Sequence, residues 1–304
     1  MRRSIFNRIV TGLPALLVVP AAVAAVGCNG NTAFCSRKYS NVTQIGSHDS
    51  AFVGVLPPDN QYIPVVDQLD FGIRFLQAQT HKKGGGIEMC HTSCLELDAG
   101  SLNSYLSPIK TWLDGNPNEV LTLLLTNGDA IPVSQFASAF AALGLDEYAY
   151  APGANLAMDQ WPTLQSMIDA GKRLVVFMGK LMASNGAENC GAHQSTSSPD
   201  YHADTSSVPY ILDEFAYFFE TPYDVTDKSF NQCTLDRPSG ASASGRMYIV
   251  NHFLDVDIFG IKIPDQINAP KTNSKTSIMA QSNLCYQAWG RLPNLILVSV
   301  YDDP

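Results

Sequence analysis

Residues 42–50 read Val-Thr-Gln-Ile-Gly-Ser-His-Asp-Ser, a short β-prone run that ends directly in a histidine and an aspartate. Outward from this segment, similar aliphatic or β-branched runs recur at residues 73–79, 120–126, 174–178, 247–251 and 295–301, with a weaker one at 215–220. Amphipathic stretches separate these runs, and strands that alternate with helices are typical of a parallel sheet covered by helices. The sequence therefore predicts an α/β fold.

Three segments between the strands have helical periodicity, and each stops at a glycine: residues 101–114, 133–143 and 164–170. Ser101 is a suitable N-cap for the first of them. The connection from the second predicted strand to this helix is long and contains Cys90, His91 and Cys94. We expect this connection to be a loop.

The length and composition fit one large domain. Of the 304 residues, 45% are hydrophobic and 15% are charged, which allows a substantial buried core. Because (β/α) barrels of about 250 residues form single domains, we expect residues 27–304 to be one unit. Residues 184–207 are rich in small and polar side chains, and we expect them to form a surface loop or an insertion.

The first 26 residues have the features of a signal peptide. Arg2 and Arg3 precede an apolar run that is short for a membrane span, is interrupted by Pro14 and Pro20, and ends in small residues. We therefore expect cleavage and secretion, and the alternative is an uncleaved membrane anchor.

The cysteine pattern fits an exported protein with disulfides. Cys28 with Cys35 and Cys90 with Cys94 are the sequence neighbours that pair most easily. Pairing Cys233 with Cys285 would then leave Cys190 single. The alternative for the 90–94 segment is a zinc site that includes His91, although a second pair of ligands at finger-like spacing is missing. Asn41-Val42-Thr43 is a glycosylation sequon that an exported chain can use if Asn41 is exposed.

The charge of the chain is acidic. Without residues 1–26, which hold three of the 19 basic residues, 16 basic residues face 28 acidic ones and the formal charge is −12. Such a surface repels phosphate backbones and gives little electrostatic attraction to anionic lipid. We expect no nucleic-acid partner and at most a peripheral contact with membranes.

The candidate functional residues lie where strands end, because the active sites of (β/α) barrels form at the carboxyl ends of their strands. The first strand is followed by His48 and Asp49. The second carries Gln77, Gln79 and His81, and the connection after it carries His91. Histidines suit proton transfer at neutral pH, because their ordinary pKa is near 6.5.

An ordered set of short motifs resembles the X-box region of the phosphatidylinositol phospholipase C-like phosphodiesterases: Gly46-Ser47-His48-Asp49-Ser50, Gln68-Leu69, Gly72-Ile73-Arg74, the loop with His91, and Asn116-Pro117-Asn118-Glu119-Val120. Later segments resemble a secreted fungal branch of this family: Trp161-Pro162-Thr163-Leu164, residues 171–177, residues 209–215 and Asn251-His252-Phe253-Leu254-Asp255. Together these motifs cover most of the chain after residue 26.

The resemblance implies a TIM-type (β/α)8 barrel, and a monomer that cleaves a phospholipid or another phosphodiester without a metal or cofactor. It implies that His48 is the general base, that His91 is the general acid, and that Asp49 orients the site. Two simpler interpretations remain. His48 can cap a turn formed by Asp49 and Ser50, and His91 can be an ordinary residue of a disulfide-stapled loop.

Three positions depart from the bacterial members of the family. Gln77 and Gln79 stand where an aspartate assists the acid and an arginine binds phosphate, and Ser299 stands where an aspartate partners the first histidine. Asp302 and Asp303 lie near Ser299 in the sequence and are candidates to compensate. We expect Gln77, Gln79 and His81 to bind substrate, although an amide lacks the charge of a guanidinium.

Two alternatives follow from these departures. Metal-dependent relatives need acidic ligands near the end of the second strand, where Gln77 and Gln79 are poor ones, although Asp49, Glu88 and Asp255 keep this alternative open. The second alternative is a catalytically weak barrel that uses the same cleft to bind a ligand. Loss of turnover in His48→Ala with an intact fold would separate the enzyme from the binding protein.

Overall fold

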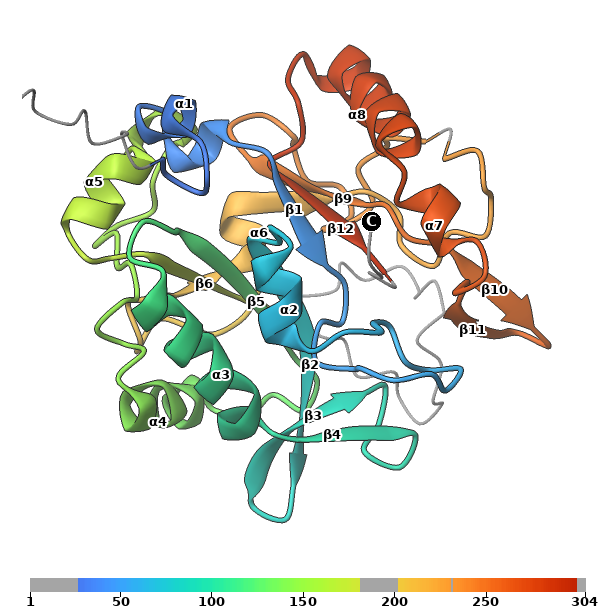
Figure 1. Cartoon of the computed structure of the whole chain (residues 1–304), viewed down its shortest axis with the longest axis horizontal. Helices are drawn as coiled ribbons and strands as arrows, with labels where there is room; N and C mark the ends of the chain where they lie inside the picture. The colour runs from blue at the N-terminus through green and yellow to red at the C-terminus, as the bar shows by residue number, and fades with distance from the viewer. Residues whose placement is uncertain (1–26, 181–201, 231, 300–304) are drawn as a thin grey trace, which may run out of the picture.

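The computed structural model describes residues 27–180, 202–230 and 232–299 (Figure 1). Its main sheet contains eight parallel strands in the order β7-β6-β5-β2-β1-β12-β9-β8. In chain order they are β1 (Gln44–Ser47), β2 (Phe75–Lys83), β5 (Leu121–Asn127), β6 (Leu174–Lys180), β7 (Ile211–Asp213), β8 (Phe218–Glu220), β9 (Met247–Asn251) and β12 (Leu295–Val298).

The sheet is curled into a barrel wall. Phe177 of β6 and Phe218 of β8 lie near opposite ends of the strand order, yet their ring centroids are 4.9 Å apart. Both belong to a buried cluster that also contains Phe75 and Leu297, so side chains fill the interior of the curl. In the part of the chain that the structure describes, no backbone pairing joins β7 to β8, and the short helix α6 (Glu214–Tyr217) connects them. The predicted barrel is confirmed, with an open seam.

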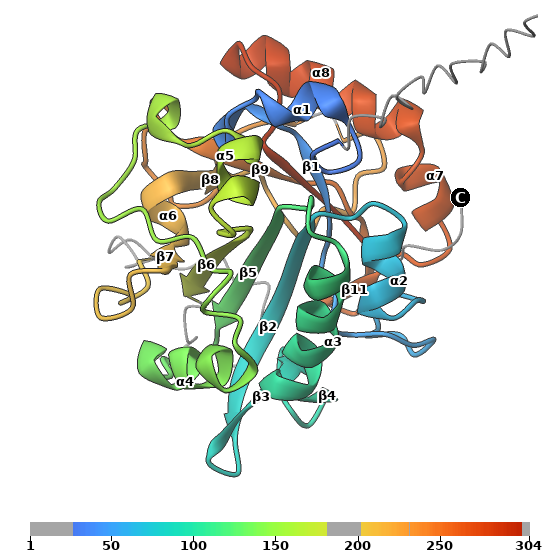
Figure 2. The ribbon, with the colours of Figure 1, turned by 60° about the vertical axis from the view of Figure 1, so that its left-hand side comes forward.

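Helices surround the sheet, and two of them, at residues 32–35 and 164–169, contact the interior cluster through Phe34 and Leu164. The surrounding helices are α1 (Thr32–Cys35), α2 (Val65–Asp70), α3 (Leu102–Gly115), α4 (Val133–Leu143), α5 (Leu164–Asp169), α7 (Ala269–Thr272) and α8 (Lys275–Trp289), with 3-10 turns at Tyr39–Asn41 and Met158–Gln160. Leu106 of α3 and Phe136 of α4 pack in one buried cluster with Leu123 of β5, so both helices lie beside this part of the sheet (Figure 2). The three predicted helices are confirmed, and Ser101 caps α3 by accepting a hydrogen bond from the Ser104 N–H.

The expected loop after the second strand is instead an antiparallel extension of the sheet. β2 runs beyond the barrel to Lys83 and pairs with β3 (Gly86–His91), which pairs with β4 (Leu97–Ser101). Gly84 and Gly85 both have positive φ, which a two-residue hairpin turn favours. The expectation of a loop was therefore wrong, because Gly84 and Gly85 form a hairpin turn. A second hairpin, β10 (Asp255–Ile258) with β11 (Ile261–Pro264), projects separately from β3 and β4, at the right of Figure 1.

Three disulfides have the expected pairing, Cys28–Cys35, Cys90–Cys94 and Cys233–Cys285. Because Cys90 and Cys94 are bonded to each other, their sulfurs are not free to bind zinc. Cys190, the predicted signal peptide and most of the expected insertion at 184–207 lie outside the described residues. No described helix combines the length and the apolar character that a bilayer crossing requires.

Candidate active site

His48 and Asp49 follow the last residue of β1, at the carboxyl ends of the parallel strands. The His48 N–H donates to the Val298 carbonyl of β12 at 2.8 Å, so backbone pairing continues one residue past β1. Asp49 turns sharply with φ of 47°, and its N–H donates to Gln77 Oε1 at 2.7 Å. The side chain of Asp49 is fully buried. Neighbouring strands β2 and β12 therefore fix the place of both residues.

One carboxylate oxygen joins the two histidines. Asp49 Oδ2 lies 3.4 Å from His48 Nε2 and 3.3 Å from His91 Nε2. His91 is the last residue of β3, so it arrives from the antiparallel extension and not from a barrel strand. The structure thus brings together His48, Asp49 and His91, as the sequence motifs predict.

The far side of the His48 ring is held by three residues. Its Nδ1 is 3.1 Å from Asn60 Oδ1 and 3.0 Å from Ser299 Oγ. Asn60 Nδ2 donates to the Pro58 carbonyl, so Oδ1 is the atom that faces the ring, and a carbonyl oxygen only accepts hydrogen bonds. Asn60 therefore favours a proton on Nδ1 of His48, and Nε2 of the ring faces the Asp49 carboxylate. Phe253 stacks on the ring at a centroid distance of 3.8 Å.

The three groups of this cluster titrate differently. Burial lowers the pKa of His48, and this effect outweighs the attraction of Asp49. Burial also disfavours charge on His91, but the Asp49 and Glu96 carboxylates overcome it and raise the pKa of His91 to about 10. Burial works to raise the pKa of Asp49, yet the adjacent His48 and His91 rings lower it. At neutral pH the site therefore holds a neutral imidazole, a carboxylate and an imidazolium.

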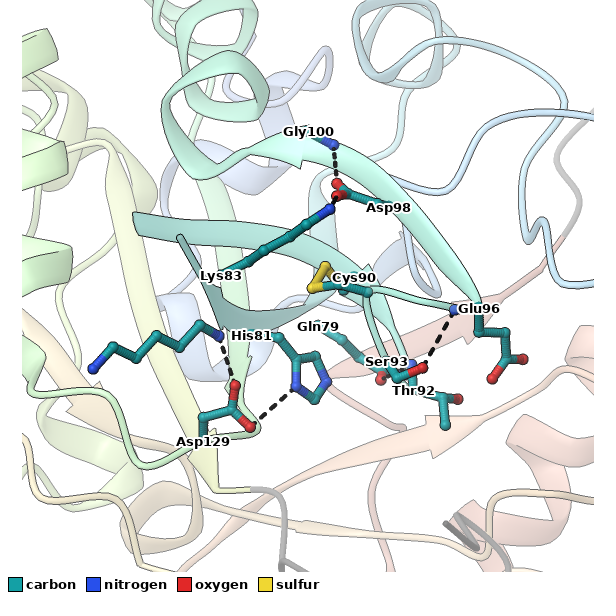
Figure 3. Close-up of a disulfide and its surroundings, with 12 residues drawn as sticks. Gln79, His81, Lys83, Cys90, Thr92, Ser93, Glu96, Asp98, Gly100 and Asp129 are labelled. Carbon is teal, nitrogen blue, oxygen red and sulfur yellow. Dashed lines mark hydrogen bonds and ion pairs between the residues drawn. A yellow bond between two sulfur atoms is a disulfide. The ribbon is translucent and has the colours of Figure 1, made fainter. Parts of the chain in front are cut away.

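The three residues expected to bind substrate have different surroundings. Gln77 Nε2 donates to Thr126 Oγ1 at 3.3 Å, in addition to the bond between its Oε1 and the Asp49 N–H. Gln79 Nε2 donates to Asp49 Oδ2 at 3.1 Å, and Gln79 Oε1 accepts from the Thr92 N–H at 3.1 Å. His81 is beside Asp129, with Nδ1 and Oδ1 3.2 Å apart (Figure 3). Both glutamine amides thus bond to the protein, and His81 pairs outside the histidine cluster.

Of the further charged residues near the site, the sequence had indicated only Asp255. Burial raises the pKa of Asp224 to about 6 and that of Asp255 to about 7, and His91 interacts electrostatically with both. Arg237 pairs with the buried Glu220 at the end of β8 and lies over the Tyr223 ring at 3.9 Å. Asp224 and Arg237 come from segments between strands, and no short motif marks them.

The described side chains bear on the question of a metal ion. In residues 27–180, 202–230 and 232–299, no group of three or more His, Cys, Asp or Glu side chains is arranged to hold a metal ion. Asp49, Glu88 and Asp255 are the acidic residues that left a metal site possible. Asp49 already contacts His48 and His91 through Oδ2. Glu88 belongs to β3, and Asp255 begins the β10–β11 hairpin.

Known proteins resemble this chain over most of its length. The PI-PLC X 1 family model matches residues 34–190 and 198–303. The PI-PLC X domain-containing protein 1 of Arthroderma benhamiae is 47% identical over 297 residues, which cover 94% of this chain and 90% of that protein. A protein of the same organism described as an uncharacterized secreted protein is 40% identical over 288 residues, and the match covers 90% of this chain but 60% of that protein.

Two bacterial enzymes share the fold. A mutant of the phosphatidylinositol-specific phospholipase C from Staphylococcus aureus has a TM-score of 0.54 and 16% identity, over 88% of this chain and 90% of that one. The phosphatidylinositol-specific phospholipase C from Listeria monocytogenes has a TM-score of 0.54 and 14% identity, over 88% of this chain and 91% of that one. At such identities the likeness establishes the barrel fold alone.

Proposed function

Because this chain belongs to the PI-PLC X family, we propose that it is a secreted phosphodiesterase that cleaves a phospholipid or a related phosphodiester by acid–base catalysis. The observation that carries the proposal is the pair of histidines on one buried carboxylate oxygen, Asp49 Oδ2. One ring is neutral and the other is charged at neutral pH, as the base and the acid of a proton-transfer reaction must be.

In this mechanism His48 is the base and His91 is the acid. His48 Nε2 takes the proton from an attacking hydroxyl, whose oxygen forms a bond to phosphorus. The bond from phosphorus to the leaving oxygen breaks, and His91 gives its proton to that oxygen. Asn60 and Ser299 keep the His48 proton on Nδ1, and Asp49 stabilises the imidazolium that forms.

The negative charge of the phosphate needs cationic partners. His91 supplies one. Arg237 is the second candidate. An isolated β-bridge pairs its backbone with Glu220, the last residue of β8, so Arg237 lies at the carboxyl ends of the parallel strands. The other described arginines precede strands or follow α1, at positions 37, 74, 173, 246 and 291. We assign Arg237 to the binding of the phosphate or its head group.

Exposed apolar side chains around the barrel mouth favour a lipid substrate. They lie on segments that follow strand ends: Val53, Val55, Leu56, Tyr62, Leu95, Ile258, Phe259 and Ile267. Phe259 at the tip of the β10–β11 hairpin and Leu95 beyond the disulfide are almost completely exposed, 102% and 98%. Gln266 Nε2 donates to the Leu56 carbonyl, so the loop after β1 and the segment after β11 form one surface. Because the chain is acidic, apolar contact is the attachment that suits a membrane here.

Secretion is part of the proposal. A relative that is 40% identical is described as a secreted protein, and three disulfides fit an oxidising compartment. The cleaved segment would be residues 1–26. Asn41 of the sequon is exposed, so glycosylation at this residue is sterically open.

A second candidate function is a binding protein without turnover. It is favoured by Gln77 and Gln79, because both amides bond within the protein and neither carries the charge of an arginine. Such a protein would retain ligand binding after His48 is replaced.

The test is a phosphodiesterase assay on the chain without residues 1–26, with phosphatidylinositol, lysophospholipids and bis-p-nitrophenyl phosphate, in the presence and absence of a chelator. We expect turnover that resists the chelator and falls at least about 100-fold in His48→Ala and in His91→Ala. His202→Ala, which removes an exposed histidine paired with Asp213, is the matched control. Absence of turnover with every substrate, alongside measurable binding, would favour the binding protein.

A further inference from the structure

We propose that Gln79 is a positioning residue for His91, and that the Cys90–Cys94 disulfide shares this role. The inference rests on the proposed function, because it assigns His91 the acid step. It gives Gln79 a role other than phosphate binding, since the residue would act on the reaction through the loop that carries the acid.

Gln79 connects the buried carboxylate to the loop. Its Nε2 donates to Asp49 Oδ2, the oxygen that also contacts His91 Nε2, and its Oε1 accepts from the backbone of Thr92, the next residue after His91. A closed path therefore runs from Asp49 through Gln79 and Thr92 to His91 and back to Asp49. Such a path fixes the distance between the imidazole and the carboxylate.

An amide is the group that this path requires. The side chain must donate to a carboxylate at one end and accept from an N–H at the other. Lysine and arginine only donate, and ionised aspartate and glutamate only accept. An arginine side chain has no acceptor to offer the Thr92 N–H. A glutamate would place a second carboxylate about 3 Å from Asp49, where like charges repel strongly. The glutamine in place of an arginine is thus a change of role and not only a loss of charge.

The disulfide restrains the same loop. Cys90 and Cys94 enclose His91, Thr92 and Ser93 in a five-residue ring. Figure 3 shows the disulfide at Cys90, with Gln79, Thr92 and Ser93 beside it. Thr92 has a φ of 59°, a left-handed conformation that is uncommon for a non-glycine residue and that the surroundings must maintain. Cys90 is completely buried, so one end of the ring is anchored in the core. Loss of either restraint should allow His91 to move away from Asp49.

The experiment compares leaving groups, because a good leaving group departs without a proton and a poor one needs the acid. Gln79→Met keeps the length of the side chain and removes both hydrogen bonds. We expect its kcat to fall about 30-fold or more with an alkyl phosphodiester and less than about 3-fold with a p-nitrophenyl phosphodiester. Gln77→Met removes the hydrogen bond to the Asp49 N–H and leaves the 90–94 loop restrained. It should lower kcat by the same factor with both substrates.

A second variant tests the disulfide. Cys90→Ser with Cys94→Ser should show the same dependence on leaving group as Gln79→Met. Cys28→Ser with Cys35→Ser should not, because that bridge lies at the amino ends of the strands, where Asn29 bonds to Val120 directly before β5. Equal losses with both leaving groups in Gln79→Met would overturn the proposal and return Gln79 to phosphate binding. If Gln79→Met does not fold, the cysteine pairs decide the question by the same comparison.

A readout without turnover separates this inference from the proposed function. An NMR titration of the His91 ring should give a pKa near 10 in the starting protein and a lower pKa in Gln79→Met and in the Cys90/Cys94 variant. An unchanged His91 pKa in both variants would overturn the positioning role even if the protein turned over no substrate. If the starting protein shows no turnover but the His91 pKa is lower in both variants, the proposed enzyme is rejected and the positioning role is kept.

Discussion

The rings of His48 and Phe253 lie face to face, with 3.8 Å between centroids and 10° between planes. Phe253 is buried and helps to keep water from the imidazole, and burial is the largest cause of the lowered pKa of His48. The two residues come from different strand ends, β1 and β9, so the packing of the barrel sets the basicity of the proposed base.

Phe253→Ala should therefore raise the pKa of His48. Because the base must be neutral, activity rises with pH through this pKa, and a higher pKa moves the acidic limb of kcat/KM to higher pH. Measurement of kcat/KM against pH checks this outcome. Phe253→Leu keeps an apolar cover and should shift the limb less, and identical limbs in all three proteins would contradict the account.

The alkaline limb should report His91. The acid must be protonated, so activity should fall as the pH rises through about 10. Glu96 supports the charged form across 3.9 Å, and Glu96→Gln should lower the pKa of His91 and move this limb to lower pH. The same pH series with Glu88→Gln is the control on strand β3. A limb that stays in place in Glu96→Gln would show that Glu96 does not act on the acid.

Asn60 should fix the tautomer of His48. Asn60→Leu removes the acceptor that faces Nδ1, and we expect kcat to fall about 10-fold or more, in keeping with the cost of an unmade hydrogen bond at a buried group. Asn60→Asp keeps an acceptor and adds charge, so it should retain more activity and raise the pKa of His48. Steady-state kinetics of both variants distinguish these effects, and equal losses would argue against a role in the tautomer.

Phe259 should contribute to attachment to lipid. Burial of one phenylalanine side chain contributes about 1.5–3 kcal/mol, so Phe259→Ser should weaken binding to zwitterionic phosphatidylcholine vesicles by about 10-fold or more. Sedimentation with vesicles measures this binding without turnover. Tyr286→Ser removes an exposed ring on α8, away from the mouth, and should bind as the unchanged protein does. Equal binding of the two variants would show that Phe259 is not part of the lipid contact.

Arg237 should act through its charge on the anionic substrate. Removing it alone would leave the buried Glu220 unpaired, so the informative variant is Arg237→Met combined with Glu220→Gln. We expect KM for a phosphodiester to rise about 10-fold while the free energy of unfolding in urea changes by less than about 2 kcal/mol. Glu220→Gln alone provides the comparison. An unchanged KM would show that Arg237 has only a structural role, as the ion-pair partner of Glu220 at the end of β8.

The sequence predicted those parts of the fold that have a regular apolar pattern. Six barrel strands and helices α3, α4 and α5 were found because each is a long enough run of alternating or helical periodicity. β7 has three residues, and the buried residues of α8 are Gln281, Ser282 and Cys285, so neither has the apolar signal on which the prediction depends. Residues 215–220, expected as a weak strand, are split between α6 and β8.

The candidate site shows the same division. The motif around His48 and Asp49, and a histidine between two cysteines, were visible in the sequence and meet in the structure. Asn60 carries no local signal, and Phe253 belongs to a quoted motif but had no role assigned to it. The importance of both comes from contact with His48 across the fold. The bonds of Gln79 likewise depend on the path of β3, which the sequence did not indicate.

A single atom, Asp49 Oδ2, receives contacts from His48, His91 and Gln79. The protonation of each of these groups therefore depends on the charge of the others. Replacing either histidine should therefore disturb the titration of the other, and the combined His48→Ala/His91→Ala protein should be little less active than each single replacement. The losses of activity measured in the single variants would then not be additive, and their sum would exceed the total contribution of the three residues to the rate.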